Sequence, residues 1–265
     1  MTSTSETPPP VVTLTTDFGT LDHYVAVMKG QILSICPKAT LVDVTHEVPA
    51  QSVGGGSFIV EQMWSWFPPG TVHVVVVDPG VGSSRRSLVV QRDDRYFVAP
   101  DNGVLSAVLR DGSARCRMID LSGLGFVELS ATFHGRDLFA PLGALIACGK
   151  VSFDDVGPVV EDPVVLEFSL PDHSLSSQVT TVVHVDHFGN IITALPLEGS
   201  SGHVVSRVEL GGVTVERGVS HYAEGEDGEL VFLRGSGGCL EVSRVNGDAS
   251  AFLGISVGER VEVIY

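Results

Sequence analysis

The chain has 265 residues, of which 43% are hydrophobic and 18% charged, and its formal net charge is −16. This composition is typical of a globular protein and excludes disorder over most of the chain. The acidic balance argues against a nucleic-acid-binding surface. No stretch is apolar over the roughly 18 residues that a membrane-spanning helix needs, so none is expected. Residues 1–10 lack the pattern of a secretory signal, and we expect a loose tail there.

Strand and helix patterns alternate in the first part of the chain. β-Branched runs predict strands at 11–16, 40–45, 72–77, 87–90 and 95–98. Apolar residues at helical spacing predict helices at 25–35, 52–66 and 138–148, and a short one after residue 102. Gly54-Gly55-Gly56 in the second helix are expected to let another backbone approach closely. The alternation predicts a layered α/β domain with a mostly parallel sheet.

The pattern changes after about residue 160. Short alternating or β-branched runs, separated by Gly-rich turns, predict strands at 164–168, 179–185, 191–195, 204–210, 229–233 and 260–264. Helical character is expected only at 248–253. This pattern predicts a small antiparallel β-barrel domain. The net charge also shifts, from −3 over residues 1–150 to −13 over residues 151–265. We predict a disordered tail over 1–10, an α/β N-terminal domain over 11–160, a linker over 161–175 and a β-barrel C-terminal domain over 176–265.

The cysteines carry no metal or redox motif. The four residues are Cys36, Cys116, Cys148 and Cys239, and no pair has C-x-x-C spacing. Scattered cysteines with apolar neighbours are typical of buried thiols in a reducing compartment, so the sequence predicts a cytoplasmic protein. The His–carboxylate neighbours along the chain also lack the spacing of a known ligand set, so we expect no metal site.

Aspartates follow several predicted strands, where open α/β sheets place their ligand crevices. They are Asp17, Asp43, Asp78 and Asp101. Taken singly, each is more often a helix cap or a turn residue than part of a site. The glycine-rich loop after Asp78 does not fit a phosphate cradle, because two arginines follow it where a P-loop has Lys-Ser or Lys-Thr. The dinucleotide fingerprint is absent too, which argues against nucleotide-phosphate binding.

Asp78 and Arg85 stand seven residues apart across that loop, a separation that allows the loop to fold back and pair them. Such a pair is most often a structural salt bridge. His134, which precedes Gly135 ahead of the last predicted helix of the first domain, is more often a hydrogen-bonded loop residue than a catalyst. From the residues alone, both the structural and the catalytic interpretation of these three side chains stay open.

Six motifs, read together, carry a resemblance. They are Thr16-Asp17-Phe18-Gly19, Asp43-Val44-Thr45-His46, Val77-Asp78-Pro79-Gly80-Val81-Gly82 followed by Arg85, Ala99-Pro100-Asp101-Asn102-Gly103, Phe133-His134-Gly135-Arg136-Asp137 and Asp186-His187-Phe188-Gly189-Asn190. In this order they resemble the S-adenosyl-L-methionine hydroxide adenosyltransferases, relatives of fluorinase and chlorinase. The resemblance runs from Val11 to the end of the chain. It implies an α/β N-terminal domain and a β-barrel C-terminal domain.

The resemblance also implies a reaction. S-adenosyl-L-methionine would be the substrate, with no cofactor, and water would attack the ribose 5′ carbon in line to give adenosine and L-methionine. The sulfonium departs as a neutral thioether, so the difficulty lies in activating the water. Asp78, Arg85 and His134 look like the family's triad, which would orient that water and lower its pKa. The family implies a homotrimer with sites between the N-terminal domain of one subunit and the C-terminal domain of the next.

By the same resemblance, eight residues would bind the substrate. Asp17 would accept hydrogen bonds from both ribose hydroxyls, as a carboxylate can. Asp186 would pair with the methionine ammonium. The others are Phe188 and Asn190 in the adenosine pocket, Ser236 and Glu241 at the methionine end, and Arg244 and Asn246 at the adenine edge.

Two alternative functions remain at this stage. A halogenase is disfavoured, because halogenases of this superfamily carry Tyr where Asp78 stands and lack the histidine at 134. Fluorinase also has an inserted loop where only five residues join Val90 and Tyr96 here. A non-catalytic S-adenosyl-L-methionine or adenosine-binding protein would not need the complete triad. A product assay with and without chloride separates these alternatives from the hydrolase.

Overall fold

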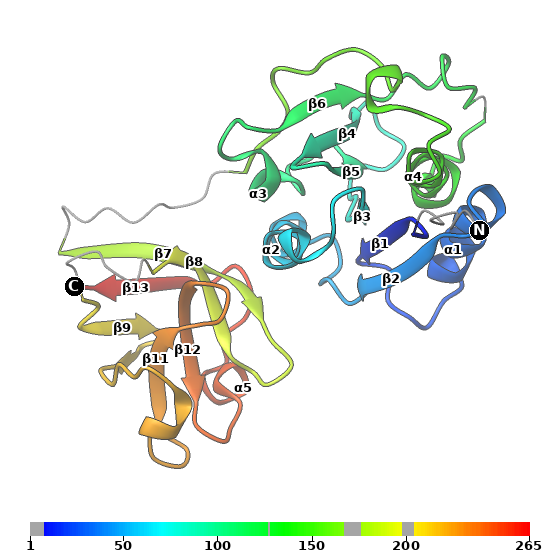
Figure 1. Cartoon of the computed structure of the whole chain (residues 1–265). Helices are drawn as coiled ribbons and strands as arrows, with labels where there is room; N and C mark the ends of the chain where they lie inside the picture. The colour runs from blue at the N-terminus through cyan, green and yellow to red at the C-terminus, as the bar shows by residue number, and fades with distance from the viewer. Residues whose placement is uncertain (1–7, 127, 167–175, 198–203) are drawn as a thin grey trace, which may run out of the picture. The chain divides into compact units, whose positions relative to one another are not determined.

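A computed structural model describes residues 8–126, 128–166, 176–197 and 204–265 (Figure 1). The chain divides into two compact units, Met1–Leu166 and Glu167–Tyr265, each built on a sheet of its own. No helix within the described ranges has the length and apolar character needed to cross a membrane.

The first unit contains a six-stranded sheet in the order β2-β1-β3-β5-β4-β6. The strands are β1 (Val11–Thr16), β2 (Thr40–Thr45), β3 (Val72–Val76), β4 (Ser87–Arg92), β5 (Arg95–Pro100) and β6 (Arg115–Met118). β2, β1, β3 and β5 pair in parallel, whereas β4 runs antiparallel to β5 and β6. The predicted α/β domain with a mostly parallel sheet is confirmed. β3 is buried along its whole length, which explains its unbroken apolar run.

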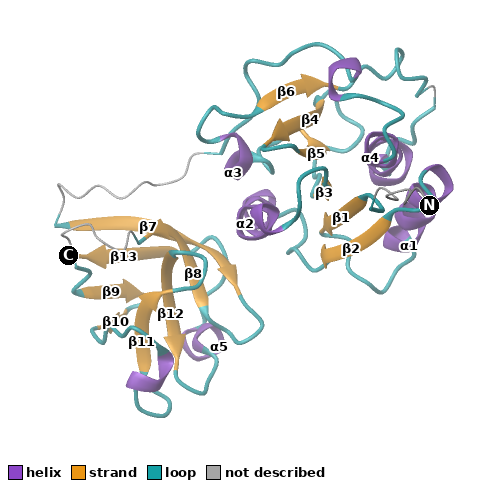
Figure 2. Ribbon diagram, in the orientation of Figure 1, coloured by secondary structure: helices purple, strands orange, loops and turns teal. Residues whose placement is uncertain are grey.

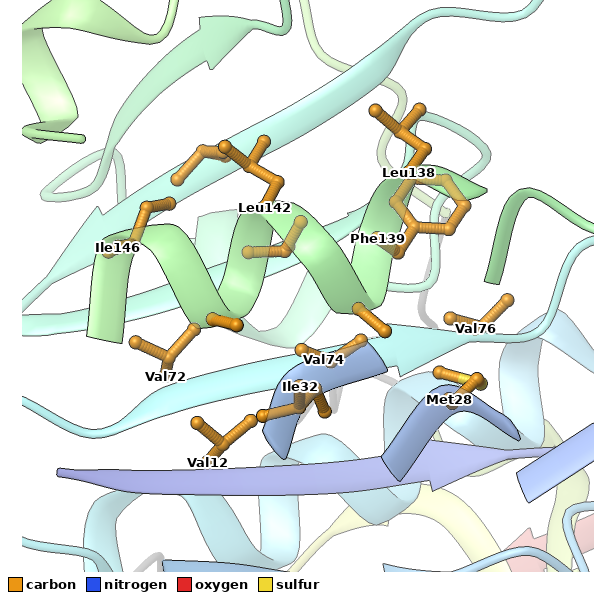
Figure 3. Packing of buried hydrophobic residues seen from close by; sticks show 14 of the residues in the cluster. Val12, Met28, Ile32, Val72, Val74, Val76, Leu138, Phe139, Leu142 and Ile146 are labelled. Carbon is orange, nitrogen blue, oxygen red and sulfur yellow. The ribbon is translucent and has the colours of Figure 1, made fainter. Parts of the chain in front are cut away.

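Helices cover both faces of this sheet. They are α1 (Tyr24–Ile35), α2 (Val53–Met63), α3 (Ser106–Leu109) and α4 (Ala140–Ala147), with 3₁₀ turns at Trp64–Trp66 and Phe153–Asp155 and a π-helical turn at Gly135–Phe139. Met28 and Ile32 of α1 and Leu142 of α4 pack on the face that presents Val72 and Val74 (Figure 3). α2 and α3 cover the opposite face, because alternate residues of a strand point to opposite sides.

The α2 helix is closely approached at Gly56, and the atoms that approach it belong to side chains. A Cβ added at Gly56 would lie 3.0 Å from methyl carbons of both Val77 and Val104. The expectation that a backbone packs against this residue is therefore wrong. The helix gives up intrinsic stability at glycine in order to lie close to the valines that follow β3 and β5.

A tight hairpin joins β4 and β5. Its two-residue turn, Asp93-Asp94, has φ angles of 47° and 57°, as a type I′ turn requires at both positions. The indole of Trp64 packs beside the hairpin, with the guanidinium carbons of Arg92 and Arg95 at 5.0 and 5.6 Å from it. The connection is short, as the sequence predicts.

The second unit is a seven-stranded antiparallel sheet in the order β10-β9-β13-β7-β8-β12-β11 (Figure 2). The strands are β7 (Ser177–Val185), β8 (Ile191–Pro196), β9 (Arg207–Leu210), β10 (Val213–Val215), β11 (Leu230–Arg234), β12 (Cys239–Arg244) and β13 (Arg260–Ile264), with one α-helix, α5 (Ala249–Leu253), and a 3₁₀ turn at Tyr222–Glu224. The two edge strands approach each other, so the sheet nearly closes around an apolar core. The predicted antiparallel barrel is confirmed.

Several element predictions fail locally. β6, β10 and β12 have no counterpart among the predicted strands. The strand predicted at 164–168 is not formed over 164–166, and its remainder lies outside the described residues, as does most of the predicted linker. The strand predicted from residue 204 begins at Arg207, and the helix predicted after residue 102 begins at Ser106.

Candidate active site

Arg85 folds back across the loop that follows β3 and pairs with Asp78. Its Nε donates to Asp78 Oδ1 at 2.8 Å, and its Nη2 bonds the other carboxylate oxygen. Nη1 donates to the Ser87 hydroxyl at 2.7 Å. The Arg85 side chain is only 10% exposed and the Asp78 side chain only 4%. This two-pronged geometry is the strongest that an arginine and a carboxylate form, and it fixes the guanidinium plane.

His134 joins this pair. Arg85 Nη2 lies 2.9 Å from His134 Nδ1. Because a guanidinium only donates hydrogen bonds, Nδ1 accepts and the ring proton sits on Nε2. Burial lowers the pKa of His134, and the Arg85 charge lowers it further, against opposing effects of Asp78 and other neighbours. The structure therefore brings Asp78, Arg85 and His134 into one hydrogen-bonded cluster with a neutral imidazole.

Two glycine contacts allow the loops of this cluster to meet. Gly82 has φ +79°, and a Cβ there would overlap the carbonyl oxygen of Ala131, so the loop after β3 passes directly against the segment before His134. A Cβ at Gly135 would lie 3.2–3.3 Å from Met28, Phe133 and Phe18. His134 occupies the position directly before the π-helical turn that leads into α4, and such turns are frequent at functional sites.

Asp17 stands at the carboxyl end of β1. The Gln51 N–H donates to its Oδ2 at 2.8 Å, and Gln51 adopts a left-handed backbone with φ 65° to do so. Within the ranges that the structure describes, Oδ1 has no hydrogen-bond partner. The Phe18 ring packs edge-on against Phe133, with centroids 5.8 Å apart. Since Phe133 precedes His134, the Asp17 loop lies beside the segment that carries the histidine.

The other polar residues at strand ends serve the fold. Asp43 pairs with Lys29 at 2.5 Å. Asp101 pairs with Arg86 at 2.6 Å and also accepts a hydrogen bond from the Val164 N–H at 2.8 Å. Asp43 and Asp101 therefore have structural contacts, in agreement with the expectation that such an aspartate is more often structural than part of a site.

Three of the expected substrate-binding residues lie in the turn between β7 and β8. Asp186 Oδ1 accepts from the N–H groups of Phe188 and Asn190 at 2.9 Å, and Oδ2 accepts from the Asn190 side chain at 2.9 Å. Asn190 is buried, whereas the Phe188 side chain is among the exposed large hydrophobic residues, at 72%. The turn thus combines an exposed aromatic ring with a carboxylate that amides of the same turn hold in place.

Glu241 of β12 is buried and contacts Tyr222, a residue that the sequence analysis did not single out. The Tyr222 hydroxyl donates to Glu241 Oε1 at 2.5 Å, and the Ser243 hydroxyl donates to the same oxygen at 2.8 Å. Burial, the bond to Glu241 and the charge of Asp186 raise the pKa of Tyr222 to about 12. Tyr222 lies in a polar, Gly-rich stretch, which contains no periodic signal that marks it.

The remaining predicted residues lie at the end of β12 and in the turns beside it. Ser236 is exposed in the turn between β11 and β12. The Arg244 guanidinium lies 4.2 Å from the Phe252 ring centroid, and its Nε donates to the Gly228 carbonyl at 3.1 Å. Asn246 has φ 54° and donates to Asp227 at 2.9 Å. Their proposed contacts with the substrate stay predictions.

The described part of the chain holds no group of three or more His, Cys, Asp or Glu side chains suited to a metal ion. None of the four cysteines, all of which lie in the described ranges, forms a disulfide bond. Burial raises the pKa of Cys116 to about 12, which keeps this thiol protonated and unreactive at neutral pH.

Residues 12–157 match the model of the SAM hydroxide adenosyltransferase N-terminal domain, and residues 180–262 match that of the C-terminal domain. The chain belongs to the SAM hydroxide adenosyltransferase family. Both units thus come from one family, in the order the family has them.

Within this family the similarity extends over nearly the whole chain. An (R)-S-adenosyl-L-methionine hydrolase of Salinispora tropica is 34% identical over 97% of this chain and 98% of its own. The crystal structure of an uncharacterized conserved protein from Thermotoga maritima is 35% identical, with a TM-score of 0.85 over 96% of this chain and 100% of that one. A fluorinase of an Actinoplanes species is 28% identical over 69% of this chain and 71% of its own. The hydrolase is therefore the closer of the two named enzymes.

Proposed function

We propose that this protein hydrolyses S-adenosyl-L-methionine to adenosine and L-methionine by in-line attack of water on the ribose 5′ carbon. The observation that carries the proposal is the hydrogen-bonded Asp78–Arg85–His134 cluster beside the Asp17 loop. The near full-length similarity to a named hydrolase supports it.

In this reaction the nucleophile, and not the leaving group, needs activation. The sulfonium leaves as a neutral thioether, so the leaving group needs no proton. Water loses one proton overall, because the positive charge of the substrate disappears as the new C–O bond forms. Catalysis then requires a water held in line and stabilised as hydroxide in the transition state.

The cluster suits that demand. The Arg85 charge lowers the pKa of a water bound beside it. His134, with its proton on Nε2, donates a hydrogen bond and so holds a hydroxide without taking its proton. The Asp78 carboxylate keeps lone pairs beyond its two bonds to Arg85, and we assign it as the acceptor of the water proton. His134 is thus an orienting donor and Asp78 the base.

We propose that Asp17 binds the ribose hydroxyls and that Asp186, Phe188, Asn190, Ser236, Glu241, Arg244 and Asn246 bind the adenosine and methionine ends. We also propose a cytoplasmic homotrimer whose sites lie between neighbouring subunits. Cysteines that form no disulfide bond support the compartment, and the family membership supports the other assignments.

The test is a product assay with isotopic water. The purified protein is incubated with S-adenosyl-L-methionine in H₂¹⁸O, with and without chloride or fluoride, and the nucleoside is analysed by mass spectrometry. The expected product is adenosine carrying ¹⁸O at the 5′ position, formed at the same rate after exhaustive chelation. A 5′-halogenated nucleoside would establish a halogenase instead, and binding without turnover a sensor. Arg85→Ala is the matched control for background hydrolysis.

A further inference from the structure

His46 is buried between the carboxyl ends of two neighbouring strands, and the reaction proposed above does not use it. It is only 4% exposed and follows β2, which lies beside β1 in the sheet (Figure 1). Its Nε2 lies 3.1 Å from Asp43 Oδ1, and its Nδ1 lies 2.8 Å from the Thr16 hydroxyl. The imidazole therefore connects a carboxylate at the end of one strand to a hydroxyl at the end of the other.

The contacts on the two sides of the imidazole differ in kind. The Asp43 carboxylate, held by Lys29 at 2.5 Å, faces His46 Nε2 in an ion-pair contact that lacks hydrogen-bond geometry. The Thr16 hydroxyl and His46 Nδ1 share a hydrogen bond. The Thr16 oxygen in turn accepts from the Phe18 N–H at 3.3 Å. Polar contacts therefore connect the loop after β1 with Asp43 through the imidazole.

The backbone of His46 holds the same loop at its other end. The Gly19 N–H donates to the His46 carbonyl at 2.8 Å. Asp17 lies in the chain between the contacts of Thr16 and Gly19 with His46. The Gln51 N–H donates a hydrogen bond to one oxygen of the Asp17 carboxylate. The loop that carries Asp17 is thus held on one side through the His46 side chain and on the other through the His46 backbone carbonyl.

The order carboxylate, imidazole, hydroxyl also occurs in nucleophilic hydrolases. Here it does not form a nucleophile. Thr16 is fully buried, and its hydroxyl oxygen is occupied by the Phe18 amide. Because that oxygen is buried and already accepts a hydrogen bond, the array is suited to hold the loop and not to attack a reacting atom.

We propose that His46 is a positioning residue for ribose recognition, which sets the Asp17 carboxylate against the ribose hydroxyls without touching the substrate. The inference rests on the proposed function, because it takes Asp17 as the ribose ligand. It predicts that discrimination between a ribose and a deoxyribose ligand is lost when the His46 side chain can no longer bridge Asp43 and Thr16.

The experiment measures the dissociation constants of adenosine and 2′-deoxyadenosine by calorimetry for the wild type and three variants. His46→Leu removes the bridge. His46→Gln keeps a polar group at this place, because an amide can donate toward the Asp43 carboxylate and accept from the Thr16 hydroxyl. His73→Leu is the matched control, since His73 is also a buried histidine whose Nδ1 bonds a β1 threonine, Thr13, at 2.7 Å.

We expect the wild type to bind adenosine about tenfold to hundredfold more tightly than 2′-deoxyadenosine, the range for one hydrogen bond to a charged group. His46→Leu is expected to bring this ratio close to one by weakening adenosine alone. His46→Gln and His73→Leu are expected to keep the ratio, whatever their melting temperatures.

Three results would overturn the inference, and they are distinguishable. If His46→Leu keeps the wild-type ratio, His46 has no part in ribose recognition while the proposed function stands. If His46→Leu and His73→Leu weaken both ligands equally, the role of His46 is structural only. If the wild type binds neither nucleoside, or fails to distinguish them, the ribose role of Asp17 falls and the inference falls with it.

Discussion

At the scale of single residues, Arg85 determines the protonation states around it. It is a donor-only group that faces a carboxylate, a hydroxyl and an imidazole at once. Each of those partners must therefore accept, which leaves the His134 proton on Nε2. The guanidinium thus decides which group of the cluster donates to a bound water and which accepts from it.

We expect His134→Ala and Arg85→Ala to lower turnover by about 10²–10⁴-fold while leaving S-adenosyl-L-methionine affinity largely intact. The substrate brings its own leaving group, so the cluster contributes mainly in the transition state. Adenosine release and calorimetry measure the two effects. Arg85→Lys, which keeps the charge but loses the two-pronged contact, is expected to recover only part of the rate. Wild-type turnover in His134→Ala would leave the cluster a structural salt bridge.

The lowered pKa of His134 gives the reaction a pH signature. The ordinary histidine pKa is 6.5, and burial followed by the Arg85 charge shifts this one downward. Activity that needs a neutral imidazole should therefore persist as pH falls to 6.5 and decline only below it. His134→Gln, which cannot titrate, should lack this acidic limb in a rate–pH profile. An acidic limb unchanged in His134→Gln would assign it to another group.

His73 couples the stability of the first unit to pH. Burial, followed by the charge of Arg95, lowers its pKa from 6.5 to about 3. As pH falls, His73 is thus protonated near pH 6.5 in the unfolded chain but only near pH 3 in the folded chain. The stability that the neutral ring contributes is complete above pH 6.5 and is lost as pH falls toward 3, by up to about 1.4 kcal/mol per pH unit.

We expect His73→Leu to flatten the dependence of unfolding free energy on pH between 6.5 and 3. Urea titrations of both proteins at a series of pH values test this. Parallel curves for the variant and the wild type in this window would show that His73 does not titrate on unfolding.

At the scale of elements, the loop after β3 must lie against the segment before His134. We expect Gly82→Ala to lower both turnover and melting temperature, because an added Cβ meets the Ala131 carbonyl and φ is +79°. Gly80→Ala is the matched control two residues earlier, where an added Cβ meets ordinary contacts of 3.5 Å or more. Equal behaviour of the two variants in rate and thermal-melt assays would contradict the loop-contact argument.

Apolar periodicity was enough to predict β1 and β2 to the residue, since β-branched runs flanked by turn residues leave little ambiguity. It missed β12 because Glu241 and Ser243 are buried on this strand through bonds to each other and to Tyr222, not through apolarity. It missed β6 because the strand carries two arginines. Their guanidiniums lie over the Phe153 ring, at 4.8 and 5.4 Å.

In the candidate site, too, one contact could be predicted from the sequence and another could not. Asp78 and Arg85 pair across a loop whose length the sequence reveals, so their contact was open to prediction from spacing. The approach of His134, 49 residues further on, depends on Gly82 and on the π-helical turn, neither of which has a periodic signature. Only the family resemblance anticipated that contact.

At the scale of the whole molecule, the proposed substrate-binding residues are divided between two units. Asp17 and the cluster belong to the first, and the turn from Asp186 to Asn190 belongs to the second. If the sites of a trimer lie between subunits, two inactive variants complement each other. We expect co-expressed Asp17→Asn and Asp186→Asn chains to regain about a quarter of the wild-type activity, since random mixing leaves that share of interfaces intact.

Sedimentation of the wild type should give a trimer, and each variant expressed alone should stay inactive. A site formed within one chain would give no recovery on co-expression, because every site would then carry one of the two substitutions.

The placement of Trp64, which packs beside the β4–β5 hairpin, has a spectroscopic consequence. The chain has two tryptophans, and both lie in the first unit, two residues apart. Indole emission therefore reports the α/β unit alone, and the barrel can unfold without changing it. A denaturation curve followed by this emission and one followed by far-ultraviolet circular dichroism coincide only if the two units unfold as one, so the pair of probes measures their cooperativity without any added label.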